Sequence, residues 1–197
     1  MSKAAKEDIV LIGGGGHCKA CIDVIEEEGK FNIAGIVDIK EKIGQKILGY
    51  EIIACDDDIP ELTKKYKNFI ITLGQIKSSD LRRKLFDILS KYKVYLPSII
   101  SPIAYVSKTA KIGEGSIVMH HALINSNAIV GKNCIINTKA LIEHDAIIGN
   151  HCHISTTAVV NGGAEIGEGT FYGSGAVCKE NIKIPAYSFI KANSIVK

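Results

Sequence analysis

Residues 100–196 repeat one pattern of apolar and polar positions every six residues, without a single insertion. The first position of each hexad is Ile or Val except at Tyr172 and Cys178, and the fifth is Ala, Ser, Cys or Thr except at Ile182. An amphipathic helix would place apolar residues three and four apart, and a simple strand would alternate. The period of six instead predicts a β-solenoid built from hexapeptides, whose first and fifth side chains point inward. A β-sandwich is the alternative, but its loops would not keep one length over so many repeats.

A slower period of eighteen residues runs through the same segment. Glycine follows the lead aliphatic residue at four equally spaced positions, Gly113, Gly131, Gly149 and Gly167. Three hexads therefore form one coil of a triangular prism, and successive coils stack about 4.8 Å apart. We expect glycine at this corner because the backbone conformation there is closed to other residues. The same register stacks Glu143-His144-Asp145 beneath Asn161-Gly162-Gly163, a more polar set than a turn requires.

Strand and helix patterns alternate in the first half of the chain. An apolar run at 8–16 ends in four glycines, and further strands are predicted at 32–38, 50–54 and 68–74. Helices are predicted at 17–28, 59–66 and 78–92. Such alternation indicates a small parallel sheet of the doubly wound type. We therefore predict an α/β Rossmann-like domain over residues 1–95 and an all-β parallel β-helix over residues 96–197.

The glycine-rich turn predicts a ligand crevice in the first domain. Ligands of doubly wound sheets bind at the carboxyl ends of the strands, which here carry Gly13–His17, Asp38 and Gly74-Gln75. A helix N-terminus favours the binding of a phosphate, and Asp38 is placed to accept hydrogen bonds from ribose hydroxyl groups. Cys18 replaces the third glycine of the dinucleotide fingerprint, which argues against NAD. A tight turn that binds nothing is the alternative, and Cys18-x-x-Cys21 also has the spacing of a redox pair.

Composition narrows the class of protein. The chain is 46% apolar, enough for a substantial core, and its net charge of +3 with interspersed acids and bases argues against a nucleic-acid binder. No apolar run reaches membrane length and none before the first strand has a signal-type core, so we expect no membrane insertion. The six cysteines lack paired metal spacing. These features predict a reduced, cytoplasmic protein.

Two motifs carry a resemblance to a known family. The segment NTKALIEHDAIIGNHCHIS (137–155) and the GGGGH turn (13–17) resemble those of bacterial nucleotide-sugar acetyltransferases of the bacillosamine and sialic-acid pathways. The resemblance covers almost the whole chain. It implies that the β-helix is left-handed, that the protein is a homotrimer with each site between two solenoids, and that acetyl-CoA is the co-substrate. The acceptor would be a nucleotide-linked, UDP-type 4-amino-deoxy sugar used in surface glycan or glycoprotein synthesis.

The resemblance also implies a role for each matching residue. His144 is the expected catalytic base, with Asp145 beside it. The other implied roles are acceptor sugar binding by Asn137 and Glu143, contact with the acetyl thioester by His153, nucleotide binding by Gly13, Gly15, His17, Asp38, Gly74 and Gln75, and lining of the coenzyme A groove by Gly162 and Gly173. Gly15 replaces a frequent Ser of the family. The terminal segment YSFIKANSIVK lacks the family's closing Gly-x-Pro-Ala-Lys motif, so no residue is assigned to the far end of the coenzyme.

The chemistry would be acyl transfer from a thioester to an amine. A base must take a proton as nitrogen attacks, and histidine suits this role because its reference pKa is about 6.5. Asp145 could orient the ring, and a backbone N–H around Gly162-Gly163 could stabilise the oxyanion. The alternatives are a sialic-acid-type O-acetyltransferase, a non-catalytic hexapeptide scaffold, and a metal hydratase. The last would need convergence of His120, His121, His151 and His153, which the repeat register does not favour, so we expect no metal.

Overall fold

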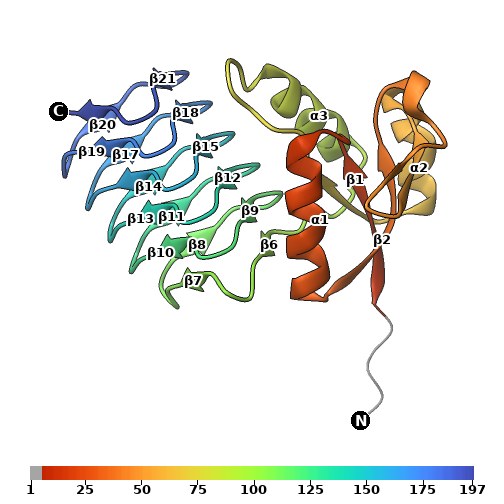
Figure 1. Cartoon of the computed structure of the whole chain (residues 1–197), viewed down its shortest axis with the longest axis horizontal. Helices are drawn as coiled ribbons and strands as arrows, with labels where there is room; N and C mark the ends of the chain where they lie inside the picture. Colours follow the sequence, from red (N-terminus) through yellow and green to blue (C-terminus); the bar gives the residue numbers. More distant parts are fainter. Residues whose placement is uncertain (1–5) are drawn as a thin grey trace, which may run out of the picture.

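A computed structural model describes residues 6–197 and places a small α/β unit against one side of a parallel β-helix (Figure 1). Four parallel strands form the sheet of the α/β unit in the order β4-β2-β1-β5, and a short antiparallel strand β3 flanks β4. Their bounds are β1 Glu7–Ile12, β2 Phe31–Val37, β3 Lys46–Ile47, β4 Tyr50–Ala54 and β5 Asn68–Ile71. The four parallel strands match the predicted ones, whereas β3 was not predicted.

Three α-helices accompany this sheet, as the sequence predicted. They are α1 Gly16–Glu28, α2 Ile59–Lys65 and α3 Asp80–Lys91, with two 3₁₀ turns at Lys40–Lys42 and Asp56–Asp58. Helix α1 starts inside the glycine turn and ends at Gly29, whose φ of 70° is the left-handed conformation that favours glycine at a helix C-terminus. Its buried side packs on the first coils of the β-helix. Cys18 and Cys21 belong to this packed side, and burial raises the pKa of the Cys21 thiol, so the two cysteines act as buried apolar side chains.

The β-helix has three parallel sheets whose paired residues are eighteen apart, for example Ile117, Ile135 and His153. The docked sheet, which carries the α/β unit, contains β6 Ile99–Ile100, β9 Ile117–Val118, β12 Ile135–Ile136, β15 His153–Ile154, β18 Phe171–Tyr172 and β21 Phe189–Ile190. The apolar-faced sheet contains β7 Tyr105–Val106, β10 Leu123–Ile124, β13 Leu141–Ile142, β16 Val159–Val160, β19 Val177–Cys178 and β22 Ile195–Val196. The third sheet contains β8 Lys111–Ile112, β11 Ile129–Val130, β14 Ile147–Ile148, β17 Glu165–Ile166 and β20 Lys183–Ile184.

The core of the β-helix consists of the first and fifth residues of the hexads. The buried cluster stacks residues such as Ile136, Ile142 and Ile154 on small ones such as Ala140 and Ala146. Tyr172 and Cys178, the two exceptions at the first position, point into the same cluster. The inward positions predicted from the period are therefore confirmed.

The reason predicted for the corner glycines was wrong. Between residues 115 and 193, the left-handed position is the fourth of every hexad, with φ between 53° and 69°. Gly113, Gly131, Gly149 and Gly167 occupy the second position and are not left-handed. Glycine is required there because the next coil lies too close for a side chain: a Cβ on Gly149 would lie 2.7 Å from the backbone nitrogen of Glu168.

Helix α3 lies along the corner between the third sheet and the docked sheet. The fourth-position residues of this corner, eighteen apart, contact side chains of the helix or of its N-cap residue Ser79. Phe86 contacts Gly115 and meets His151 edge-on, Arg82 binds Asn133, Ser79 lies against Gly169, and Arg83 binds Tyr187. These contacts hold the α/β unit on the β-helix.

Candidate active site

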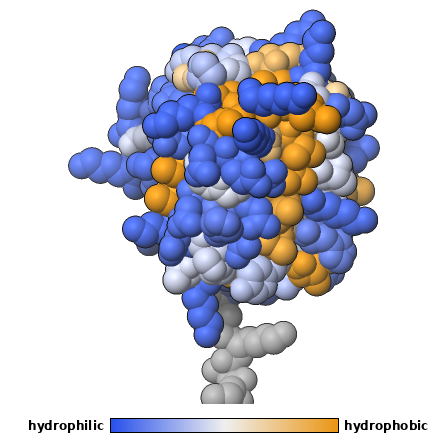
Figure 2. Space-filling view, turned by 90° about the vertical axis from the view of Figure 1, so that its left-hand side faces the viewer, coloured by the Kyte–Doolittle hydropathy of each residue, from blue (hydrophilic) through white to orange (hydrophobic). Residues whose placement is uncertain are grey.

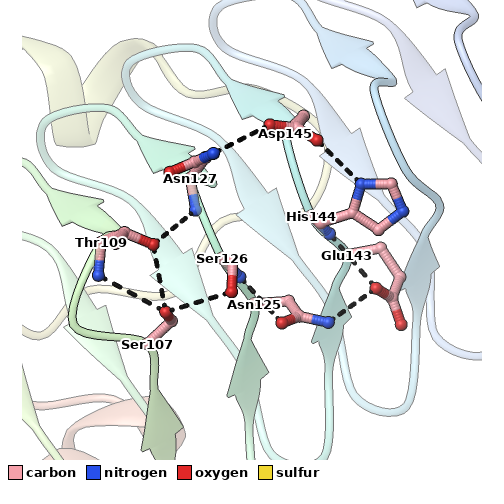
Figure 3. A network of polar contacts seen from close by, with 8 residues as sticks. All are labelled: Ser107, Thr109, Asn125, Ser126, Asn127, Glu143, His144 and Asp145. Carbon is pink, nitrogen blue, oxygen red and sulfur yellow. Dashed lines mark hydrogen bonds and ion pairs between the residues drawn. The ribbon is translucent and has the colours of Figure 1, made fainter.

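The corner after β13 presents the predicted Glu143, His144 and Asp145 on the outside of the β-helix (Figure 3). Asp145 takes the left-handed conformation with φ of 60°, which turns the chain toward the third sheet. Backbone bonds hold the corner from both neighbouring coils: Asp145 N–H donates to the Ser126 carbonyl at 3.0 Å, and Gly163 N–H donates to the His144 carbonyl at 3.0 Å. The side chains therefore project from a rigid backbone.

His144 and Asp145 form a hydrogen-bonded pair. The His144 Nδ1 lies 2.8 Å from Asp145 Oδ2, and Asn127 Nδ2 donates to Asp145 Oδ1 at 3.3 Å from the coil below. A carboxylate partner assigns the proton to Nδ1, which leaves the Nε2 lone pair free. The hydrogen bond to Asp145 raises the pKa of His144, and bonds from His144 and Asn127 lower the pKa of Asp145. The pair has the arrangement of an oriented general base.

Glu143 stabilises the corner from the other side of the ring (Figure 3). Its Oε2 accepts hydrogen bonds from Asn125 Nδ2 at 2.8 Å and from the His144 N–H at 3.2 Å. In this conformation the carboxylate supports the backbone that carries the imidazole. Asn125 and Asn127 were not among the predicted site residues, but the coil register places each of them eighteen residues before the side chain it binds.

Gly162 lies directly over the imidazole. A Cβ on Gly162 would lie 2.8 Å from His144 Cε1 and 2.9 Å from Nε2, closer than real contacts allow. Within residues 6–197 the Gly162 N–H donates no hydrogen bond, whereas the Gly163 N–H is used in the backbone ladder. Of the two amides considered as oxyanion donors, only that of Gly162 is therefore available.

His153 and Asn137 lie at a different place, against the α/β unit. The His153 Nδ1 lies 2.6 Å from the Gln75 carbonyl oxygen, and its Nε2 lies 3.1 Å from Asn137 Nδ2. Burial lowers the pKa of His153 to about 4, so the ring is neutral, with Nδ1–H donating and Nε2 accepting. The structure thus brings Gln75, Asn137 and His153 together at the junction of the two halves of the chain.

The glycine-rich turn follows β1 at the carboxyl edge of the sheet, and we call the region beside it the crevice. Gly13 has φ of 105° and its N–H donates to the Val37 carbonyl at 2.8 Å, while Gly14 N–H donates to Asp38 Oδ2 at 3.0 Å. Asp38 also binds Lys42 at 3.1 Å. Although burial alone would raise it, the pKa of Asp38 is lowered by hydrogen bonds from the Ile39 N–H, Lys42 and Gly14. Asp38 therefore anchors the turn.

The remaining nucleotide-side residues complete this crevice. Gly15 precedes α1 as its N-cap, and a Cβ there would meet nothing within 4 Å. His17 lies beside Gly74, and its ring centroid is 6.4 Å from that of His153. The His17 Nε2 is buried without a hydrogen-bond partner in the described part of the chain. Burial, followed by the charge of Arg82, lowers the pKa of His17 to about 3.

Two separate groups therefore contain the predicted site residues. The crevice group is Gly13, Gly15, His17, Asp38, Gly74 and Gln75, continuous with His153 and Asn137. The His144 corner, with Asp145, Glu143 and Gly162, lies between the apolar-faced and third sheets, one corner further around the same prism. Gly173 lies between the docked and apolar-faced sheets, where a Cβ would come within 2.6 Å of the Ile190 carbonyl oxygen and Ala192 nitrogen, so its absent side chain serves coil stacking.

Two further histidines, His120 and His151, are engaged in structural contacts. His120 Nδ1 lies 2.7 Å from Ser101 Oγ and its Nε2 lies 2.7 Å from Asp23 Oδ2 on α1. His151 Nδ1 lies 3.0 Å from Asn133 Nδ2 beneath α3. Across residues 6–197, no three His, Cys, Asp or Glu side chains are grouped so as to hold a metal ion.

Comparison with known proteins places the chain in a family. Residues 8–89 match the model of the PglD N-terminal domain. The fold superposes on perosamine N-acetyltransferase from Caulobacter crescentus, solved as a histidine-to-asparagine variant in complex with CoA and GDP-perosamine. The TM-score is 0.91 and the identity 30%, over 100% of this chain and 91% of the other. The chain belongs to the nucleotide-sugar acetyltransferase family. Its fold class, a Rossmann-like α/β unit followed by a left-handed parallel β-helix, is the predicted one.

Two further proteins resemble the chain, one in sequence and one in fold. UDP-N-acetylbacillosamine N-acetyltransferase of Bacillus subtilis (strain 168) is 33% identical over 116 residues, which are 57% of this chain and 51% of the relative. The chain thus spans about half the length of this curated relative. The acetyltransferase domain of PglB from Neisseria gonorrhoeae FA1090 shares the fold at a TM-score of 0.90, with 23% identity over 98% of this chain and 92% of that domain. No helix within residues 6–197 combines the length and apolarity needed to cross a bilayer.

Proposed function

We propose that this protein transfers the acetyl group of acetyl-CoA to the amino group of a nucleotide-linked, UDP-type 4-amino-deoxy sugar. The observation that carries the proposal is the His144–Asp145 pair, with its Nε2 lone pair free and the unbonded Gly162 amide above the ring. A base and an amide donor side by side are the two groups that aminolysis of a thioester requires.

Each residue of the His144 corner has one role in the proposed reaction. The sugar nitrogen attacks the thioester carbonyl carbon, a C–N bond forms, and His144 Nε2 takes the proton that nitrogen loses. Asp145 stabilises the resulting imidazolium, and the Gly162 N–H donates to the transient oxyanion. The C–S bond then breaks, and the coenzyme thiolate leaves and recovers the proton from His144. Acetyl-CoA is a co-substrate, and every proton transfer is assigned to a side chain of this protein.

The proposal assigns nucleotide binding to residues 1–95 and acetyl transfer to residues 96–197. The Gly13–His17 turn and the N-terminus of α1 would receive the diphosphate, with Asp38 holding the turn in shape. Asn137 and His153 lie beside Gln75 at the junction of the two halves of the chain, where the sugar and the thioester would meet.

A homotrimer would unite the two groups of residues. The apolar-faced sheet lies between the Asn137 corner and the His144 corner, and its outward side chains form an apolar row: Tyr105, Leu123, Leu141, Val159, Val177 and Ile195. No element of residues 6–197 is packed over this row, and apolar surface is exposed where it reaches the C-terminal end (Figure 2). Packing of this sheet on a neighbouring solenoid would bring the His144 corner of one subunit to the Asn137 corner of the next.

Amine acetylation is favoured over the alternative of O-acetylation. The relatives from Caulobacter crescentus and Bacillus subtilis are both N-acetyltransferases, and their nucleotide sugars are a GDP and a UDP derivative. A non-catalytic scaffold would not need the His144–Asp145 pair. A cytoplasmic location fits the six free cysteines.

The test is a mass-spectrometric screen of the purified protein with acetyl-CoA against UDP- and GDP-linked amino sugars. We expect a gain of one acetyl group on an amine, with release of coenzyme thiol, and its loss in His144→Ala. Full transfer by His144→Ala would refute the assigned base. Acetylation of hydroxyl groups alone would support the O-acetyltransferase alternative, and coenzyme binding without any transfer would support the scaffold.

A further inference from the structure

Arg82 is a buried cation without an acidic partner. Its exposed fraction is 1%, and no carboxylate in residues 6–197 forms an ion pair with it. The guanidinium donates instead to carbonyl and amide oxygens: Nη1 to Ile71 and Leu73, and Nη2 to Asn133. Burial lowers the pKa of Arg82 to about 10, so the group stays charged at neutral pH. An unneutralised buried charge is costly unless another group offsets it.

The groups that Arg82 holds belong to the crevice and to the β-helix at once. Ile71 and Leu73 lie where β5 ends, at the carboxyl edge of the sheet. Leu73 packs on Gly13, where a Cβ would lie 2.9 Å from the Leu73 nitrogen, and Thr72 Oγ1 donates to the Gly13 carbonyl at 2.6 Å. Asn133 belongs to the β-helix, and the distances from Nη2 to its Oδ1 and backbone oxygen are 2.7 and 3.2 Å. One guanidinium therefore joins the wall of the glycine turn to a coil.

The charge of Arg82 also acts on the ligand side of this wall. After burial, it is the next largest cause that lowers the pKa of His17, and it also lowers the pKa of His153. These two rings lie 6.4 Å apart, and His17 follows the glycine turn directly in the chain. The positive field of Arg82 therefore extends into the space where the N-terminus of α1 already favours an anion.

We infer that Arg82 is a positioning residue whose uncompensated charge is balanced by the diphosphate of the nucleotide sugar. The inference rests on the proposed function, because it assigns the diphosphate to the Gly13–His17 turn. Arg82 does not touch the ligand. It fixes the loop that shapes the turn, and its charge strengthens anion binding through the low-dielectric interior.

The experiment compares direct nucleotide binding by calorimetry, with UDP and uridine as probes, in the full-length protein. In Arg82→Met we expect UDP to bind about tenfold or more weakly, with a much smaller change for uridine, since uridine lacks the diphosphate. Arg82→Lys should recover part of the UDP affinity, because lysine keeps the positive charge but lacks the planar guanidinium group with its several N–H donors. Arg83→Met is the matched control: this neighbour contacts Asp80 and Tyr187 on the surface, and its loss should leave UDP binding unchanged.

A second variant guards against loss of folding in Arg82→Met. Asn133→Asp keeps the size of the side chain but places a carboxylate against the guanidinium, so it neutralises the charge without removing Arg82. We expect a folded protein with weakened UDP binding and an unchanged KM for acetyl-CoA. Unchanged UDP affinity in Asn133→Asp, or equal losses for UDP and uridine in Arg82→Met, would overturn the inference. A wild-type protein that binds no nucleotide would overturn the nucleotide crevice as well, whereas a protein that binds UDP but transfers no acetyl group would refute only the proposed reaction.

Discussion

The contact between Gly162 and the His144 ring allows a sharp test of the site. The substitution is Gly162→Ala, which adds one methyl group to the outer face of the β-helix. Gly162 does not have a positive φ, so alanine fits its backbone. Such a change removes freedom from the unfolded chain and, taken alone, stabilises a protein by about 0.4–1 kcal/mol.

The structural cost falls on the imidazole. The added Cβ would lie 2.8 Å from His144 Cε1, whereas ordinary contact begins at 3.4 Å, so the ring must move by about 0.6 Å. Most of the His144 side chain is exposed, at 63%, so the ring can move away without unfolding the corner. The movement also disturbs the 2.8 Å bond to Asp145. Because a misplacement of about 1 Å can cost about 100-fold in rate, we expect kcat to fall roughly 30- to 100-fold.

The assay measures kcat and KM with acetyl-CoA and the acceptor identified by the screen, together with the melting temperature. We expect the melting temperature and both KM values to stay near those of wild type, since the change acts on the position of the base. The matched control is a double-mutant cycle with His144→Ala. Loss of a positioned base costs about 10²–10⁴-fold, and once it is absent Gly162→Ala should cost nothing more. A single variant with kcat within twofold of wild type, or additive losses in the cycle, would refute the role given to Gly162.

Three other predictions follow from the same structure. Asp145→Asn removes the carboxylate that raises the pKa of His144. Because the base works deprotonated, kcat/KM should rise with pH through a pKa above 6.5 in wild type and through a lower pKa in the variant. Coincident pH profiles of the two proteins would contradict this prediction. Leu141→Glu places a charge in the middle of the apolar row, so sedimentation should show loss of the trimer together with activity, whereas an active monomeric wild type would refute the assembly. Asp38→Ala frees the Gly14 amide and should raise KM for the sugar nucleotide while leaving that for acetyl-CoA nearly unchanged; equal increases would argue against a separate nucleotide crevice.

The hydrophobic period accounts for most of what could be predicted. Coil register, inward side chains and the stacking of the His144 corner beneath Gly162 all follow from spacings of six and eighteen. The left-handed fourth position could not be read in the same way. His, Lys, Thr and Tyr occupy it as well as Asn and Gly, so residue type does not reveal φ there. The fixed geometry of the coil, rather than local preference, imposes that conformation.

Features that depend on the docking of the α/β unit on the β-helix also could not be predicted from the hydrophobic pattern. His153 holds an outward position of its strand, and only the α/β unit buries it and lowers its pKa. Arg82 lies in a helix whose sequence reads as amphipathic, where an arginine is ordinarily a solvated residue. The two-residue strand β3 is too short to show a period. In each case the deciding partner is distant in sequence and no repeat connects the two.

Because α3 is docked along one corner of the β-helix, the stacking of the coils sets a distance between two parts of the molecule. The contact of Arg82 with Asn133 fixes the α/β unit in one register on the β-helix, and His144 follows Asn133 by eleven residues, so this register sets the distance along the prism from the glycine turn to His144. One more or one fewer coil would shift that distance by about 4.8 Å. This is several times the misplacement that catalysis tolerates, which is about 1 Å. Repeat proteins usually accept a gain or loss of repeats, but here the docking of α3 ties the position of His144 relative to the glycine turn to one coil register.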